Sequence, residues 1–345
     1  MSEDLELDVT EESAEEESSG SLKYEIMNYP ADTTLSGYLD MWKNQQLVIP
    51  KFQRNYVWDQ VKASKLIESF LLGLPVPGVF LFKEKNSSHY LIIDGQQRIT
   101  SIVYFLMGVY KENVFRLKNV APKWDKKRFE DLSEQDQFSL KSSVLRSTII
   151  QQINPTDNSS IYPIFERLNT GGVNLNPMEI RQCVSFGPFV ETLNEMNVNE
   201  HWRKIVGSDT PDARLRDVEL VLRSLALAEN FGAYEKPMKA FLNDFMEMNR
   251  NKTAKYADYK QKFFVTCQRI VHALGEKPFH LRGKLNYGVL DSVFNALYHN
   301  EDVHDISTKY QALIANEEYY GAVTLNTSDN AEVDKRIKIA MKILV

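Results

Sequence analysis

The feature that most constrains this chain of 345 residues is a change of hydrophobic period at Asp94 and Gly95. Val79–Lys83 and Tyr90–Asp94 are short apolar runs typical of strands, with a turn at residues 86–88 between them. After Gly95 the apolar residues recur with helical spacing, at Ile99, Ile102, Val103, Leu106 and Met107. The polar loop Asp-Gly-Gln-Gln-Arg is therefore predicted to lie where a buried strand leads into the N-terminus of a helix.

The rest of the chain predicts two lobes. Helical spacing appears at residues 34–44, 61–71 and 161–169, whereas residues 147–153 are typical of a strand. From Asn176 onward nearly every segment has helical periodicity. The predicted fold class is α+β: a domain over residues 23–175, whose small mixed sheet presents the Asp-Gly-Gln-Gln-Arg loop at one edge, and then a mainly helical domain over residues 176–345.

The charge of the chain is unevenly distributed. Residues 2–21 contain nine acidic and no basic side chains, and the rest of the chain has 41 basic and 38 acidic residues. Such a segment buries too little apolar surface to order itself, so residues 1–22 are predicted to be a disordered acidic tail. The tail either serves solubility or mimics nucleic-acid phosphates in front of a basic site. No apolar run is long enough to span a bilayer, and we expect a cytoplasmic protein.

The loop between strand and helix has the chemistry of an anion site. The N-terminus of a helix offers free N–H groups and the positive end of the helix dipole. Arg98 adds a donor fork suited to phosphate, Gln96 and Gln97 add neutral donors, and Thr100 adds a hydroxyl. Asp94 would repel a phosphate unless it binds Mg²⁺ or orients water. The alternative is structural: Asp94 caps the helix and pairs with Arg98.

Two further motifs carry polar and aromatic residues. The first precedes the helix at residues 61–71, and its arginine and rings suit the phosphates and base of a nucleotide, although Tyr56 and Trp58 are equally compatible with core positions. It contains Gln53, Arg54, Tyr56 and Trp58. The second lies at the C-terminal end of the helix at residues 161–169 and finishes in two glycines that either admit a ligand or simply stop the helix. It contains Arg167, Asn169 and Thr170.

Taken in order, these three motifs resemble the N-terminal domain of GmrSD-type restriction enzymes; Leu175 and Glu179 extend the third. The resemblance covers about residues 35–230. It implies a ParB/sulfiredoxin-like fold and a loop tied to binding and hydrolysis of an NTP, either GTP or ATP. Together with the chemistry of the side chains, we predict Mg²⁺ at Asp94 and catalysis by Asp94, Gln97 and Arg98. The residues predicted to bind the nucleotide are Gln53, Arg54, Tyr56, Trp58, Gly95, Gln96, Thr100, Arg167, Asn169 and Thr170.

The resemblance also implies a role in defence against foreign or modified DNA. Longer family members often end in a His-Asn-His nuclease domain, whereas this chain ends in helical segments, so a separate nuclease subunit is expected. Two alternatives stay open: a metal-dependent nuclease that uses Asp94 with Glu166 or Glu179, and a non-catalytic DNA-binding adaptor. Basic clusters such as Lys126-Lys127-Arg128 are typical of solvated faces and do not by themselves indicate DNA binding.

A triphosphate needs several cations to offset its desolvation. We therefore expect Arg54, Arg98 and Arg167, one from each motif, to converge on one anion site.

Overall fold

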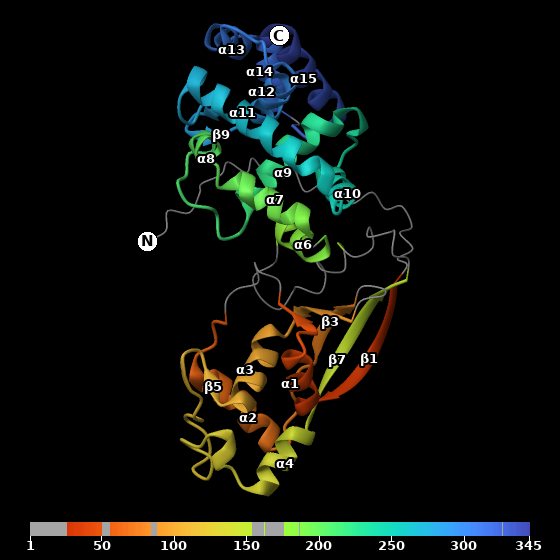
Figure 1. Cartoon of the computed structure of the whole chain (residues 1–345), viewed down its shortest axis with the longest axis vertical. Helices are drawn as coiled ribbons and strands as arrows, with labels where there is room; N and C mark the ends of the chain where they lie inside the picture. Colours follow the sequence, from red (N-terminus) through yellow and green to blue (C-terminus); the bar gives the residue numbers. More distant parts are fainter. Residues whose placement is uncertain are drawn as a thin grey trace. The chain divides into compact units, whose positions relative to one another are not determined.

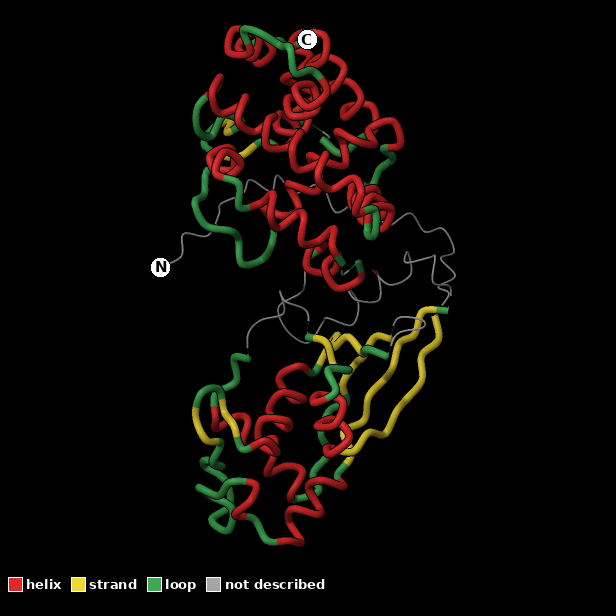
Figure 2. Tube along the Cα trace, in the orientation of Figure 1, coloured by secondary structure: helices red, strands yellow, loops and turns green. Residues whose placement is uncertain are grey.

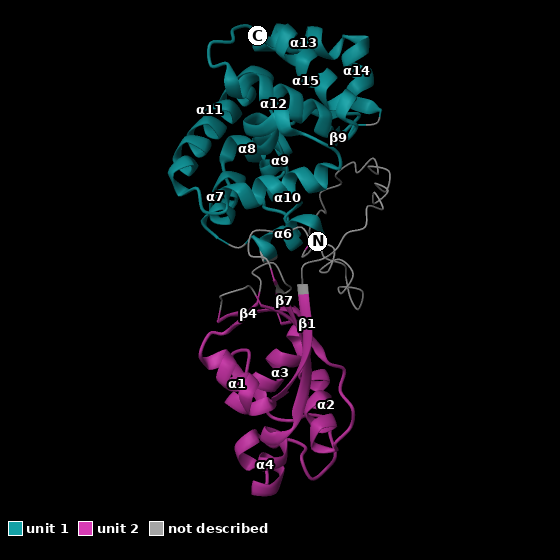
Figure 3. Cartoon of the chain, turned by 90° about the vertical axis from the view of Figure 1, so that its right-hand side faces the viewer, with its two compact units in different colours: residues 1–20, 176–345 teal, residues 21–175 magenta. Residues whose placement is uncertain are grey.

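The structure is a computed structural model that describes residues 26–49, 56–83, 88–153, 162, 176–185, 187–325 and 327–345. The predicted acidic tail lies outside the described residues. The chain divides into two compact units, one containing residues 21–175 and the other containing residues 176–345 (Figure 3). Each unit has its own hydrophobic core, as expected for a chain of this length.

The first unit is built on a five-stranded mixed sheet with the strand order β1-β7-β3-β4-β2. Strand β3 pairs antiparallel with β4 and parallel with β7, and β7 pairs antiparallel with β1. The two-residue strand β2 pairs in parallel with the first two residues of β4, so β4 lies one position in from the edge. The strands are β1 (Ile26–Thr34), β2 (Leu47–Val48), β3 (Val79–Lys83), β4 (Tyr90–Asp94) and β7 (Val144–Gln152).

Helices cover one face of this sheet (Figure 1). Their apolar stripes pack against inward-facing sheet residues such as Leu81, Ile92 and Ile149. Asp59 caps α2 by accepting from the Lys62 N–H, and Gly73 follows its C-terminus with a positive φ. The helices are α1 (Leu35–Lys43), α2 (Gln60–Leu71), α3 (Gln96–Met107) and α4 (Glu134–Ser142); a small hairpin of β5 (Val109–Tyr110) and β6 (Asn113–Val114) follows α3.

The second unit is almost entirely helical in its described residues (Figure 2). Its core gathers large side chains such as Trp202, Phe263 and Phe294. A short hairpin of β8 (His280–Leu281) and β9 (Lys284–Leu285) interrupts the helices, which are α6 (Pro177–Val184), α7 (Pro188–Asn197), α8 (Glu200–Val206), α9 (Arg216–Asn230), α10 (Met238–Asn249), α11 (Tyr256–Leu274), α12 (Tyr287–His299), α13 (Ile306–Ile314), α14 (Glu317–Thr324) and α15 (Asn330–Leu344).

The predicted fold class is confirmed: a small mixed sheet with helices lies in the N-terminal region and helices follow. The finer ParB/sulfiredoxin-like assignment stays a prediction. Strand β1 was not predicted, because Pro30 and several polar residues weaken its pattern; an edge strand tolerates a proline that a central strand would not. Within the described part of the chain, no helix combines the length and apolar character needed to cross a membrane.

Candidate functional site

Gly95 makes the turn from β4 into α3, and only glycine fits there. Its φ is +95°, in the left-handed region that side chains disfavour. A Cβ at this position would also lie 2.2 Å from Cγ1 of Val79 on the neighbouring strand β3. Gly95 is the N-cap residue of α3 and supplies no side-chain cap. The alternative in which Asp94 caps the helix is therefore wrong for the described geometry.

Asp94 pairs with Arg98 instead, as the second part of that alternative predicted. Oδ2 of Asp94 lies 2.5 Å from a terminal nitrogen of Arg98. The other terminal nitrogen of Arg98 donates to the carbonyl oxygen of Pro77 at 3.0 Å. The Asp94 side chain is 44% exposed and that of Arg98 is 16% exposed. Because solvent reaches the carboxylate, the pair is open to exchange with a ligand.

Gln97 joins the Asp-Gly-Gln-Gln-Arg loop to the motif that contains Tyr56 and Trp58. Its side-chain oxygen accepts from the backbone N–H of Val57 at 3.0 Å and from that of Trp58 at 3.1 Å. The carbonyl oxygen of Trp58 accepts in turn from the Tyr110 hydroxyl at 2.8 Å. The ammonium of Lys62 lies 4.9 Å from the centre of the Trp58 ring. Residues 40 positions apart in sequence therefore meet at the start of α3.

Tyr56 is anchored beside them. Its hydroxyl lies 2.8 Å from Oγ of Ser101, and its ring makes edge contacts with Tyr104 and Tyr110. Burial raises the pKa of Tyr56 to about 12. The sequence had not singled out Ser101, Tyr104 or Tyr110; helical spacing after the loop was an available signal for Ser101 and Tyr104, whereas Tyr110 lies in β5 beyond the helix.

Of the remaining predicted side chains, the structure describes those of Gln96 and Thr100. Gln96 is the first residue of α3 and is partly exposed. Thr100 is only 2% exposed, and its hydroxyl has no hydrogen-bond partner, so its burial counts against direct contact with a ligand. The other predicted residues lie outside the described part of the chain, and their convergence with Arg98 stays a prediction: Gln53, Arg54, Arg167, Asn169 and Thr170.

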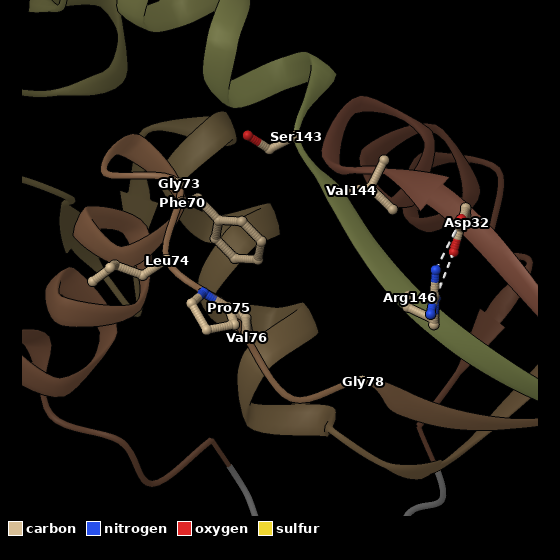
Figure 4. A pocket seen from close by; sticks show the side chains of 10 residues that line it. All are labelled: Asp32, Phe70, Gly73, Leu74, Pro75, Val76, Gly78, Ser143, Val144 and Arg146. Carbon is tan, nitrogen blue, oxygen red and sulfur yellow. Dashed lines mark hydrogen bonds and ion pairs between the residues drawn. The ribbon is translucent and has the colours of Figure 1, made fainter.

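The loop that joins α2 to β3 lines a pocket of about 410 Å³ together with residues of β1 and β7 (Figure 4). Phe70, Leu74 and Val76 line it, and Asp32 and Arg146 in its wall are paired with each other at 2.9 Å. No residue of the Asp-Gly-Gln-Gln-Arg loop lines this pocket. We place the candidate site at the Asp-Gly-Gln-Gln-Arg loop, because there an arginine and a carboxylate lie at the N-terminus of α3, whereas the pocket's lining apart from Asp32 and Arg146 is largely apolar.

Glu179, a ligand in the alternative nuclease interpretation, is buried at the start of α6. Its carboxylate accepts from the backbone N–H of Asn176 and forms a two-pronged ion pair with Arg214 at 2.8 and 3.2 Å. These contacts cap the helix and fasten it to the chain before α9. Among the residues that the structure describes, no group of three or more His, Cys, Asp or Glu side chains could hold a metal ion.

Comparison with known families decides the relationship that the three motifs suggested. Residues 35–186 match the GmrSD restriction endonuclease, N-terminal domain. This segment belongs to that family. The GmrSD domain thus includes the whole Asp-Gly-Gln-Gln-Arg loop, its anchors at Val57 and Trp58, and the beginning of the helical unit. By its description, that family is the N-terminal domain of a restriction endonuclease.

The chain also resembles an uncharacterized protein, MJ0686, of Methanocaldococcus jannaschii. The two are 31% identical over an alignment of 100 residues, which covers 22% of this chain and 16% of that protein. The alignment therefore spans less than a fifth of the relative's own length.

Proposed function

We propose that this chain is the NTP-binding and NTP-hydrolysing subunit of a restriction-like defence system that recognises foreign or modified DNA, with nuclease activity supplied by a partner. The observation that carries the proposal is the Asp94–Arg98 pair at the start of α3. A positive fork and a carboxylate lie together at a helix N-terminus, and solvent reaches the carboxylate.

The pair suits a nucleotide phosphate in the following way. Arg98 exchanges its bond with Asp94 for a bond with a phosphate oxygen, and the helix start adds backbone donors. The carboxylate that is set free orients water or contributes to a Mg²⁺ site together with the phosphates. Mg²⁺ commonly binds through one or two carboxylates plus substrate phosphates, which fits the single acidic residue in the loop. Such an ion would offset phosphate charge.

A basic segment beside the site supports DNA as a second partner. Residues 109–128 carry seven basic and two acidic side chains. The segment is adjacent to the site: Tyr110 bonds to Trp58, and the Lys111 ammonium lies 5.7 Å from the Tyr110 ring. Lys111, Lys118, Lys126 and Lys127 form no ion pair within the described part of the chain. Free lysines on an exposed segment are available for backbone phosphates.

The other basic clusters in the sequence contrast with this segment. Arg203, Arg214, Arg216 and Arg336 each pair with a carboxylate inside the helical unit. Their charges are already used for internal structure. Residues 109–128 are therefore the surface we propose for DNA, and substitution of Lys126 and Lys127 by Gln should lower duplex affinity and reduce its salt dependence by about two phosphate contacts.

The decisive experiment measures nucleotide binding by calorimetry and phosphate release with Mg²⁺, with and without modified DNA. Arg98→Ala should weaken nucleotide affinity by about 10- to 100-fold, the equivalent of ~1.5–3 kcal/mol for a charged hydrogen bond. Arg146→Ala is the matched control, since it removes an arginine that pairs with an aspartate in the same unit away from the loop. Equal affinities of Arg98→Ala and wild type would refute the site.

Asp94→Asn tests the second role. It should keep most of the nucleotide affinity while lowering turnover by about 10²-fold, the scale for loss of a positioned catalytic group. Wild-type hydrolysis in this variant would assign Asp94 to structure. Binding of an NTP without any hydrolysis would favour the non-catalytic adaptor.

A further inference from the structure

The segment before α2 contains two backbone donors without a local acceptor. Val57 and Trp58 precede the N-cap residue Asp59, so the hydrogen bonds of the helix do not include their N–H groups. Both donors point to the same atom, Oε1 of Gln97, at 3.0 and 3.1 Å. One amide oxygen with two lone pairs satisfies both of them.

This geometry fixes the orientation of the side-chain amide of Gln97. Two N–H donors require the oxygen to face them, so the NH₂ group is the only part of the amide left for any other purpose. A side chain whose oxygen is committed to the backbone in this way cannot at the same time use that oxygen to orient water.

Two neighbouring bonds strengthen the same attachment. Ser101 donates its hydroxyl proton to the carbonyl oxygen of Gln97 at 2.7 Å, so the Tyr56 hydroxyl is the donor in the 2.8 Å bond to Ser101. Tyr110 closes the other end by donating to the carbonyl oxygen of Trp58. Residues 56–58 are thus held at both backbone and side chain against the helix that begins with the loop.

We propose that Gln97 is a positioning residue: its side-chain oxygen holds the backbone of Val57 and Trp58 and so fixes Tyr56 and Trp58 beside the start of α3. The proposal rests on the proposed function only in that the two rings would lie beside a nucleotide bound at Arg98. The attachment itself is a property of the chain without any ligand, and it is measured that way.

The first measurement is amide hydrogen exchange at single-residue resolution on the full chain without nucleotide. Val57 is 56% exposed as a residue, so we expect the bond to Gln97, more than burial, to protect its amide. Gln97→Met removes the acceptor and should speed exchange at Val57 and Trp58 by about 3- to 10-fold, whereas Gln97→Glu keeps an acceptor oxygen and should preserve the slow exchange.

Gln137→Met is the matched control. Gln137 also bridges two backbone groups in the same unit, by donating to the carbonyl oxygens of Glu130 and Leu132. Its loss should leave exchange at Val57 and Trp58 unchanged. Should Gln97→Met unfold, wild type and Gln97→Glu still decide: fast exchange at both amides in wild type, or loss of protection in Gln97→Glu, would overturn the proposal.

The second measurement separates positioning from catalysis. If Gln97 only places the two rings, Gln97→Met should raise KM for the NTP several-fold with little change in kcat; a tenfold or larger fall in kcat at constant KM would overturn the positioning role. If the wild type hydrolyses no NTP, the proposed function fails, and the exchange experiment still stands as the test of Gln97.

Discussion

The two units of this protein use arginine–aspartate pairs under opposite conditions. In the GmrSD domain, Arg98 meets a half-exposed Asp94 and a backbone carbonyl at the start of α3. In the helical unit, Asp291 is 0% exposed and binds both Arg223 and Arg336, each at about 2.8 to 2.9 Å. The chemical groups are the same, and their access to water differs. The comparison teaches that burial, not residue type, separates a pair that can exchange with a ligand from one that holds a fold together.

In the buried cluster, most polar atoms of Arg223, Asp291 and Arg336 are hydrogen-bonded within the helical unit. Arg223 forms a two-pronged contact with Asp291, and Arg336 adds a bond to the Thr327 carbonyl oxygen. Burial lowers the pKa of Arg336, while the charge of Asp291 acts in the opposite direction. Two positive charges on one carboxylate leave no capacity for a further cation, and removal of the carboxylate would leave both arginines buried without compensation.

The largest expected effect breaks this cluster. Asp291→Asn should lower the free energy of unfolding of the helical unit by about 3–5 kcal/mol, because it leaves two buried arginines uncompensated. Asp94→Asn is the comparison, and its cost should stay below about 1 kcal/mol because that pair is half exposed. Chemical denaturation followed by circular dichroism measures both. Equal losses in the two variants would contradict the distinction drawn from burial.

The next effect concerns the turn that presents Arg98. Gly95→Ala should destabilise the GmrSD domain by about 2–4 kcal/mol, since it adds both a left-handed strain and a clash with Val79. Gly73→Ala is the control: its φ of +69° carries the strain, but a Cβ there meets nothing within 4 Å. It should cost about 1–2 kcal/mol. Denaturation monitored by tryptophan fluorescence reports on this unit when Trp202 of the helical unit is replaced by Phe in all variants, because the other three tryptophans, Trp42, Trp58 and Trp124, belong to the first unit.

The smallest effect concerns Tyr56. Tyr56→Phe removes the bond to Ser101 and should cost about 0.5–1.5 kcal/mol at neutral pH. Burial raises the pKa of Tyr56 from about 10 to about 12, so the unfolded chain loses this proton first. The stabilisation is therefore complete below pH ~10 and is lost as the pH rises toward 12. Urea midpoints of wild type and variant at several alkaline pH values should converge; a constant gap would show that Tyr56 does not titrate in this range.

Much of the fold was readable from local patterns. Strands β3 and β4 have the predicted bounds, and residues 34 and 44, the predicted ends of the first helix, are the cap residues of α1. Strand β7 begins three residues earlier than predicted, because its pairing with β1 extends to Thr34 opposite Val144. Met107, predicted for the inner face of its helix, is exposed at the C-terminal end of α3. The first difference arises because a strand partner remote in sequence, and not the local period, sets the end of β7, whereas Met107 is the last residue of a helix that ends at the left-handed Gly108.

Local sequence patterns were enough to predict the strand-to-helix turn at Gly95, the position of Arg98 one helical turn after Asp94, and the helical character of the second unit. Those features depend on spacing and backbone preference, which are local. Three contacts became visible in the folded chain alone. Gln97 binds the backbone of Val57 and Trp58, Pro77 accepts from Arg98, and Glu179 pairs with Arg214. Each of these contacts joins residues 21 to 40 positions apart, and such pairings follow from how strands and helices pack, which no local period encodes.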